Sequence, residues 1–135
     1  MKKITIIDGQ GGRMGKTIIE QLKKQFPQQP LLAIGTNSIA TAAMLKAGAD
    51  YGATGENPVI VAARDSDIII GPIGIVIADS LYGEVTEAMA AAVGRSSAQQ
   101  ILMPVNRCNH HVVGCDELTM NEIIALVVKQ VKAYL

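Results

Sequence analysis

Four glycines separate a short apolar run from an amphipathic pattern near the start of the chain. The apolar run covers residues 4–8 and the amphipathic pattern covers residues 16–26. The glycines between them are Gly9, Gly11, Gly12 and Gly15. When a strand leads into a helix through glycines, backbone amides and the positive end of the helix converge on an anion without a side chain in the way. This segment therefore predicts a phosphate-binding loop.

The glycine spacing indicates which phosphate site to expect. Gly9-x-Gly11-x-x-x-Gly15 is a longer-spaced variant of the dinucleotide fingerprint G-x-G-x-x-G. Residues 15–17 read G-K-T, like the end of a P-loop, but Gln10 stands where that motif requires its first glycine. We therefore favour nucleotide binding at this loop. A P-loop-like ATP site and a merely tight strand-to-helix turn are the alternatives.

The residues after the second expected strand bear on the choice of cofactor. In nicotinamide-binding folds an acid at this place hydrogen-bonds the ribose. Here Gly35 is followed by Thr36, Asn37 and Ser38. The missing acid removes the usual repulsion against a 2′-phosphate, and Arg13 could supply a positive charge. We expect the cofactor to be NAD(P), with NADP slightly favoured.

Short apolar runs alternate with helical patterns along the whole chain, without a linker or internal repeat. This alternation predicts one α/β domain over residues 1–135, a three-layer Rossmann-like sandwich with a mostly parallel sheet. The expected strands cover 4–8, 31–35, 67–71 and 100–105, with weaker candidates at 49–54 and 112–113. The expected helices cover 16–26, 38–47, 57–64, 119–135 and one or two segments within 75–94.

Several helix ends carry a residue suited to that position. Ser38 is the expected cap of the second helix, and Gly48 is expected to close it. Pro58 suits the first position of the third helix. Thr119 is the expected cap of the last helix, with Glu122 placed for a capping box.

The loops that leave the strand ends gather glycine and polar residues. In an open α/β sheet these ends lie at one edge, where ligands bind at the switch in strand order. Loops of this kind need glycines and caps in any such fold, which is the structural alternative to a binding site. The expected binding residues are Gly9, Gln10, Gly11, Gly12, Arg13, Met14, Gly15, Thr36, Asn37, Ser38, Gly71, Pro72 and Ile73.

Catalytic and metal-binding residues are harder to find. Cys108, His110, His111, Cys115 and Asp116 are side chains that zinc accepts. In an extended segment, however, the two adjacent histidines point to opposite faces. We therefore expect no metal site. Cys108 remains the candidate for a reactive cysteine.

Two acidic residues follow the Gly-Pro-Ile-Gly loop, with four residues between them. They are Asp79 and Glu84. Proton transfer by either would require a position beside the ligand. Such residues more often cap or solvate helix ends, so no catalytic residue is assigned.

Charge and hydropathy narrow the class of partner. Twelve basic and twelve acidic residues give a formal net charge of zero, without runs of like charge. Nucleic acid and anionic membrane surfaces are therefore poor candidates. The longest apolar stretch, residues 68–78, is too short to cross a bilayer and is broken by Gly71-Pro72. We expect a cytoplasmic protein with reduced cysteines.

The segment from Gly9 to Lys16 resembles the nucleotide loop of dihydrodipicolinate reductase, in which a glycine-rich turn ending in Gly-Arg-Met-Gly binds NAD(P)H. The likeness implies that Gly12, Arg13, Met14 and Gly15 face the diphosphate and adenosine. It covers only the start of the chain. His110-His111 matches a histidine pair of that family, but its Lys-x-Asp-x-Pro-Ser-Gly-Thr motif is missing here.

Longer strings resemble a bacterial family of short proteins, domain-of-unknown-function family 3842. They are I-D-G-Q-G-G at 7–12, G-T-N-S-I-A-T-A-A-M-L-K-A-G-A-D at 35–50, A-T-G-E-N at 53–57 and I-I-I-G-P-I-G-I at 68–75. This resemblance implies a Rossmann-like fold and no known activity.

Three functions remain open from the sequence. The first is a nucleotide-binding sensor or regulatory subunit. The second is a small NAD(P)-dependent oxidoreductase whose site is completed by a second copy of the chain, because one domain leaves little room for a substrate pocket. The third is a scaffold subunit without nucleotide affinity. We expect a homodimer and a small-molecule nucleotide as partners, and no nucleic acid or membrane.

Overall fold

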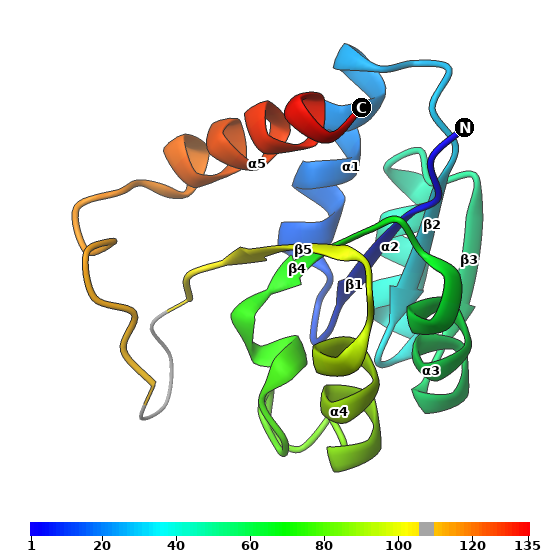
Figure 1. Cartoon of the computed structure of the whole chain (residues 1–135), viewed down its shortest axis with the longest axis vertical. Helices are drawn as coiled ribbons and strands as arrows, with labels where there is room; N and C mark the ends of the chain where they lie inside the picture. The colour runs from blue at the N-terminus through cyan, green and yellow to red at the C-terminus, as the bar shows by residue number, and fades with distance from the viewer. Residues whose placement is uncertain (106–109) are drawn as a thin grey trace.

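Five parallel strands form one sheet in the order β3-β2-β1-β4-β5 (Figure 1). The computed structural model describes residues 1–105 and 110–135. The strands are β1 (Ile4–Asp8), β2 (Leu31–Gly35), β3 (Tyr51–Thr54), β4 (Ile68–Pro72) and β5 (Gln99–Met103). The order equals the first five positions of the common doubly wound arrangement, which reverses direction between β1 and β4. The α/β class and the parallel sheet are confirmed.

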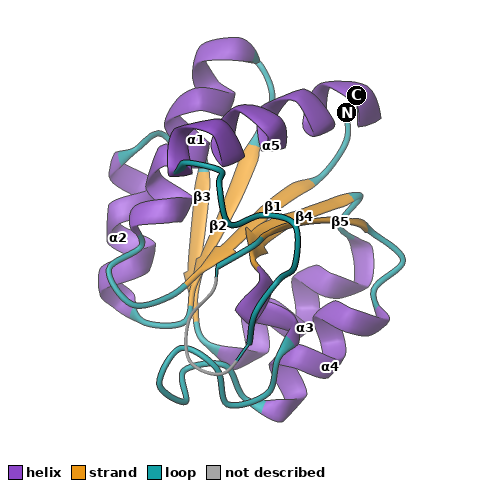
Figure 2. Cartoon of the chain, turned by 90° about the vertical axis from the view of Figure 1, so that its left-hand side faces the viewer, coloured by secondary structure: helices purple, strands orange, loops and turns teal. Residues whose placement is uncertain are grey.

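Helices cover both faces of the sheet and make three layers (Figure 2). They are α1 (Arg13–Gln25), α2 (Ser38–Lys46), α3 (Glu56–Asp65), the 3₁₀ helix η1 (Ile73–Val76), α4 (Glu87–Arg95) and α5 (Met120–Tyr134). One core joins the sheet to α1, α2 and α5, and a second joins it to α3, α4 and η1. β1 and β4 lie between these two cores, which explains their nearly continuous isoleucine runs.

Helix starts differ from the sequence expectation at three places. α1 begins at Arg13 instead of residue 16, directly after Gly12 turns the chain with a φ of 71°. Asn37, not Ser38, caps α2, because its side chain accepts a hydrogen bond from the Ala40 amide. α3 begins at Glu56, which puts Pro58 at its third position and not its first. The capping box of α5 is confirmed.

Of the one or two helices expected within 75–94, α4 is present, but the segment between β4 and α4 is mostly not helical. After η1, residues 77–86 form a chain of turns, which we call the strap. The φ angles of Asp79, Leu81, Tyr82 and Gly83 are positive, from 55° to 84°. Right-handed helices require negative φ, so the strap cannot continue a helix.

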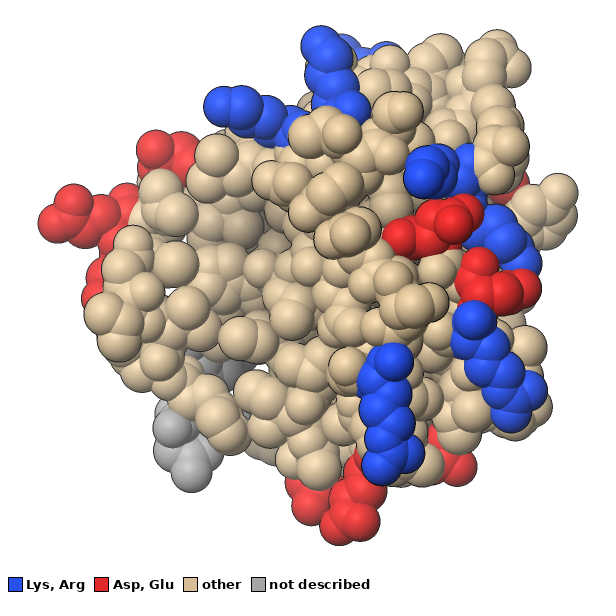
Figure 3. Space-filling model, in the orientation of Figure 1, with Lys and Arg blue, Asp and Glu red and all other residues tan. Residues whose placement is uncertain are grey.

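Residues 112–113 do not form the edge strand that was expected. In the described part of the chain, no helix has both the length and the apolar character needed to span a membrane. Basic and acidic side chains are interspersed over the face that Figure 3 shows.

At the amino ends of the strands, one carboxylate connects three elements. The Asp50 Oδ2 atom lies 2.6 Å from Lys23 Nζ on α1 and accepts a 2.8 Å hydrogen bond from the Leu31 amide at the start of β2. The lysine, and after it the Leu31 amide, holds the pKa of Asp50 below its ordinary value of 3.8. A lowered pKa means that the stabilisation exists above the unfolded-state pKa and is lost as the pH falls.

We therefore expect Asp50→Asn to lower the free energy of unfolding at pH 7 by up to about 1 kcal/mol. The deficit should shrink as the pH falls below 3.8, where the wild-type carboxylate also loses its charge. Urea denaturation between pH 3 and pH 7 measures both. Asp65→Asn is the control, because both partners of the Lys3–Asp65 pair are 61% exposed. A deficit that does not change with pH would contradict this role.

Candidate functional site

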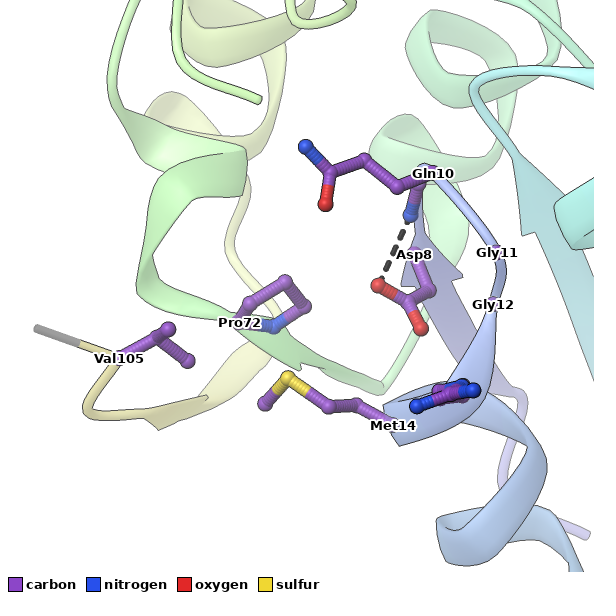
Figure 4. A pocket seen from close by; sticks show the side chains of 9 residues that line it. Asp8, Gln10, Gly11, Gly12, Met14, Pro72 and Val105 are labelled. Carbon is purple, nitrogen blue, oxygen red and sulfur yellow. Dashed lines mark hydrogen bonds between the residues drawn. The ribbon is translucent and has the colours of Figure 1, made fainter. Parts of the chain in front are cut away.

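An open pocket of about 290 Å³ lies at the carboxyl ends of β1 and β4, at the reversal of strand order. Its lining comprises Asp8, Gly9, Gln10, Gly11, Gly12, Arg13, Met14, Pro72 and Val105. Figure 4 shows the Met14 side chain extending toward Pro72, with Asp8 beside the loop of Gly11 and Gly12. The structure thus brings together the glycine loop and Pro72, as the sequence predicts.

Three glycines of the loop are required by the fold. A Cβ atom on Gly9 would lie 2.6 Å from Thr36 Oγ1, and one on Gly12 would lie 2.9 Å from the Ala40 backbone. A Cβ on Gly15 would collide with the Met44 side chain. These glycines are spaced three apart. The pattern that the fold requires is therefore G-x-x-G-x-x-G, and not the Gly9-x-Gly11-x-x-x-Gly15 spacing expected from the sequence.

Gly11 differs from the other three glycines. A Cβ atom built on it meets no atom within 4 Å, its φ is not in the positive range, and the residue is exposed. The fold therefore does not explain why a glycine stands here. It lines the pocket, where the absence of a side chain leaves the backbone open to close approach by a ligand.

The last residue of β1, Asp8, connects the strand to the start of α1. Its side chain is buried, Oδ1 accepts a 2.8 Å hydrogen bond from the Gly9 amide, and Oδ2 accepts one of 2.8 Å from the Gly15 amide. Gly15 is the third residue of α1, and Gly12 at the cap position has no side chain to offer. Asp8 therefore accepts the hydrogen bond from a helix amide that an N-cap side chain would otherwise accept.

Burial raises the pKa of Asp8 above 3.8. The Gly15 and Gly9 amides oppose this shift, while the charge of Glu84 adds to it. The pocket thus has a carboxyl group that holds its proton more tightly than an exposed aspartate does. Groups whose pKa is shifted by burial are frequent at functional sites.

Two backbone amides beside Asp8 have no partner among the described residues. They belong to Gly11 and Arg13, whereas the Gly12 amide donates to the Gly9 carbonyl at 2.9 Å. Both residues line the pocket, and the Arg13 side chain is exposed. Free amides at a helix N-terminus, next to an arginine, are suited to an anion.

A second polar cluster lies at the carboxyl end of β2, on the other side of the glycine loop. The Glu84 Oε1 atom, on the strap, accepts hydrogen bonds from the Gln10 amide at 2.8 Å, Thr36 Oγ1 at 2.5 Å and Asn37 Nδ2 at 2.9 Å. Burial raises the pKa of Glu84, but these three donors outweigh it and hold the pKa below 4.5. Glu84 is therefore a fixed negative charge.

The other expected binding residues lie outside the pocket lining. Thr36 and Asn37 contact Glu84, and Ser38 is exposed on the first turn of α2. Gly71 lies against β1, because a Cβ there would be 2.5 Å from the Ile7 carbonyl oxygen. Ile73 begins η1.

Asp8, Glu84 and Val105 were not among the binding residues expected from the sequence. A carboxylate as the last residue of a buried strand could have marked Asp8. No local pattern links Glu84 to Thr36, which lies 48 residues earlier in the chain.

The cysteine and histidine segment is described only in part. His111 Nε2 lies 3.2 Å from Asp116 Oδ1. Cys108 and Asn109 lie outside the described residues, so the interpretation of Cys108 as a reactive thiol stays a prediction. Among the residues that the structure describes, no group of three such side chains is close enough to hold a metal ion.

Replacing Asp8 tests its role as a surrogate cap. We expect Asp8→Asn to lower the free energy of unfolding by about 1–3 kcal/mol, since the amide NH₂ faces a backbone donor. The raised pKa makes the wild-type contribution greatest below pH 3.8, so the deficit should narrow as the pH rises above that value. Urea denaturation between pH 4 and pH 8, with Asp65→Asn as control, measures it. A wild-type stability would contradict the cap.

The comparisons with known proteins give a family but no activity. A family model described as "Domain of unknown function (DUF3842)" matches residues 3–135. No curated protein matches the chain.

Among solved structures, the chain is similar to a dodecameric FMN-dependent UbiX-like decarboxylase from Escherichia coli O157:H7. The identity is 16%, the TM-score is 0.44, and the match covers 96% of this chain and 93% of that one. A likeness at this level does not transfer a ligand or an activity.

Proposed function

We propose a function from the geometry of the site, because the chain belongs to the family Domain of unknown function (DUF3842), whose description assigns none. The chain binds a nucleotide at the carboxyl edge of its sheet, and the first candidate is a nicotinamide dinucleotide, NAD(P). It acts as a sensor or regulatory subunit. The observation that carries the proposal is Gly11, a pocket glycine that the fold does not require, whose own amide and that of Arg13 have no partner among the described residues.

The ligand's phosphate is expected at the outer side of the α1 N-terminus. Asp8 already takes the Gly9 and Gly15 amides, so the inner part of this terminus holds a carboxyl group of the chain itself. The amides of Gly11 and Arg13 remain for the ligand, together with the exposed Arg13 guanidinium. An arginine and main-chain amides are the groups with which proteins commonly hold a diphosphate.

The titratable groups favour binding over catalysis. Asp8 and Arg13 are the ionisable residues in the described lining of the pocket. An arginine does not give up its proton, and the Asp8 oxygens are engaged by main-chain amides. A site that can hold an anion but has few groups for proton transfer is suited to a protein that senses a nucleotide without converting it.

The size of the pocket supports a second copy of the chain as partner. Its volume of about 290 Å³ is at the lower end of ligand pockets, and a dinucleotide needs more room. Part of such a ligand would stay exposed on a single chain. A homodimer would cover it and complete the site.

Calorimetric titration with NADH, NADPH and Mg-ATP tests the proposal. We expect one nicotinamide dinucleotide to bind with a dissociation constant of about 1–100 μM, and Mg-ATP to bind more weakly, because the P-loop spacing is not met. Gly11→Ala should weaken binding about tenfold or more, since its methyl group occupies the approach to the amides.

Gly94→Ala is the matched control for that variant. Gly94 lies exposed on α4, and a Cβ atom there also meets no atom within 4 Å. Affinity should be unchanged in this variant, and both variants should fold as judged by circular dichroism. Wild-type affinity in a folded Gly11→Ala variant would refute the loop assignment, and no binding of either dinucleotide would refute the proposal.

Light scattering after size-exclusion chromatography tests the dimer. The chain has a mass of 14.2 kDa, and we expect a particle of twice that mass at micromolar concentration. Added nucleotide should favour the dimer, because the ligand contacts both copies. A particle of single-chain mass with the nucleotide bound would contradict the shared site.

A further inference from the structure

The carboxyl end of β2 bears an acidic group although β2 has no acidic residue. In nicotinamide-binding folds an acid at this place hydrogen-bonds the ribose hydroxyls, while NADP-binding proteins accommodate a 2′-phosphate there. The chain continues from Gly35 into Thr36 and Asn37, and both side chains donate to Glu84 on the strap. The tertiary structure therefore places a carboxylate where the sequence lacks one.

We propose that Glu84 is the specificity-determining residue of the nucleotide site, accepting the ribose hydroxyls of NAD and excluding the 2′-phosphate of NADP. This inference rests on the proposed function and specifies its ligand. It reverses the slight preference for NADP that follows from the sequence of the β2 loop.

The hydrogen bonds of Glu84 leave one oxygen available. Oε1 receives all three donors, from Gln10, Thr36 and Asn37. No described residue donates a hydrogen bond to Oε2. The side chain is only partly buried, so the carboxylate keeps contact with solvent. Two ribose hydroxyls are donors of the kind that a carboxylate oxygen accepts.

The same hydrogen bonds make the position unfavourable for a phosphate. A phosphate monoester carries a charge of about −1.5 to −2 at pH 7. The polar side chains that follow β2, Thr36 and Asn37, already donate to the carboxylate. A 2′-phosphate would therefore meet a negative charge instead of donors. Like charges brought together in this way oppose binding.

The strap holds Glu84 in place. The Asp79 amide donates to the Val85 carbonyl at 2.7 Å, and the Val85 amide donates to the Ser80 carbonyl at 3.2 Å. Val85, the next residue after Glu84, is 1% exposed and belongs to the core beneath α3 and α4. The positive φ angles at Leu81 and Tyr82 cost energy, and such conformations persist where surrounding structure enforces them.

Gly9 shows that the loop is shaped around this carboxylate. A Cβ atom on Gly9 would lie 2.9 Å from Glu84 Oε1, 2.8 Å from Leu81 Cδ1 and 2.6 Å from Thr36 Oγ1. Gly9 must therefore lack a side chain for the strap to pack against the loop. Loop and strap form one unit, with the phosphate cradle on one side and the Glu84 carboxylate on the other.

Titration of NADH and NADPH into the wild type and Glu84→Gln tests the inference. Glutamine keeps an oxygen acceptor for the three donors but removes the charge. We expect the wild type to bind NADH at least about tenfold more tightly than NADPH, and the variant to narrow that ratio by about tenfold or more, chiefly by binding NADPH better. Glu87→Gln is the control, because it removes the same charge at an exposed position on α4, and it should keep the wild-type ratio of the two affinities.

The outcomes separate this inference from the function on which it rests. If both dinucleotides bind and Glu84→Gln leaves their ratio unchanged, Glu84 does not set specificity, although the nucleotide site stands. A wild type that prefers NADPH also overturns the inference alone. If neither dinucleotide binds the folded protein, the proposed function fails and this inference fails with it. Circular dichroism and urea denaturation of Glu84→Gln confirm that a changed ratio is not caused by unfolding.

Discussion

The Asp8 carboxylate is the interaction on which the site depends. It ends β1, the central strand, and its two oxygens hold the amides of Gly9 and Gly15, the first and last glycines of the loop. A buried carboxylate loses its water, so it must recover hydrogen bonds within the protein. The amides at the start of α1 supply them, and the strand, the loop and the helix are thereby fixed relative to one another.

The four glycines of the loop have different roles in this arrangement. Gly12 turns the chain with a positive φ and lets α1 approach the backbone of Ala40 on α2. Gly15 leaves room for Met44, and Gly9 leaves room for the strap. Gly11 has no such task within the fold. Three of the four glycines in this loop are therefore required by packing, and Gly11 is the one that packing does not explain.

Two carboxyl groups border the loop, and their pKa values are shifted in opposite directions. Burial dominates at Asp8 and raises its pKa, whereas hydrogen bonds dominate at the more exposed Glu84 and lower its pKa. Asp8 thus stabilises the junction of β1, the loop and α1, and it is suited to face an uncharged part of a ligand. Glu84 presents a permanent charge at the edge.

The sequence by itself determined the α/β class, most strand positions and the glycine-rich turn from β1 into α1, because alternating apolar runs and glycines act through local backbone geometry. It also gave the capping box at Thr119, which spans only four residues. Only the tertiary structure decided the strap and the partners of Glu84. Positive φ angles at Leu81 and Tyr82 have no sequence signal, and a contact between residues 48 positions apart depends on how the sheet brings loops together.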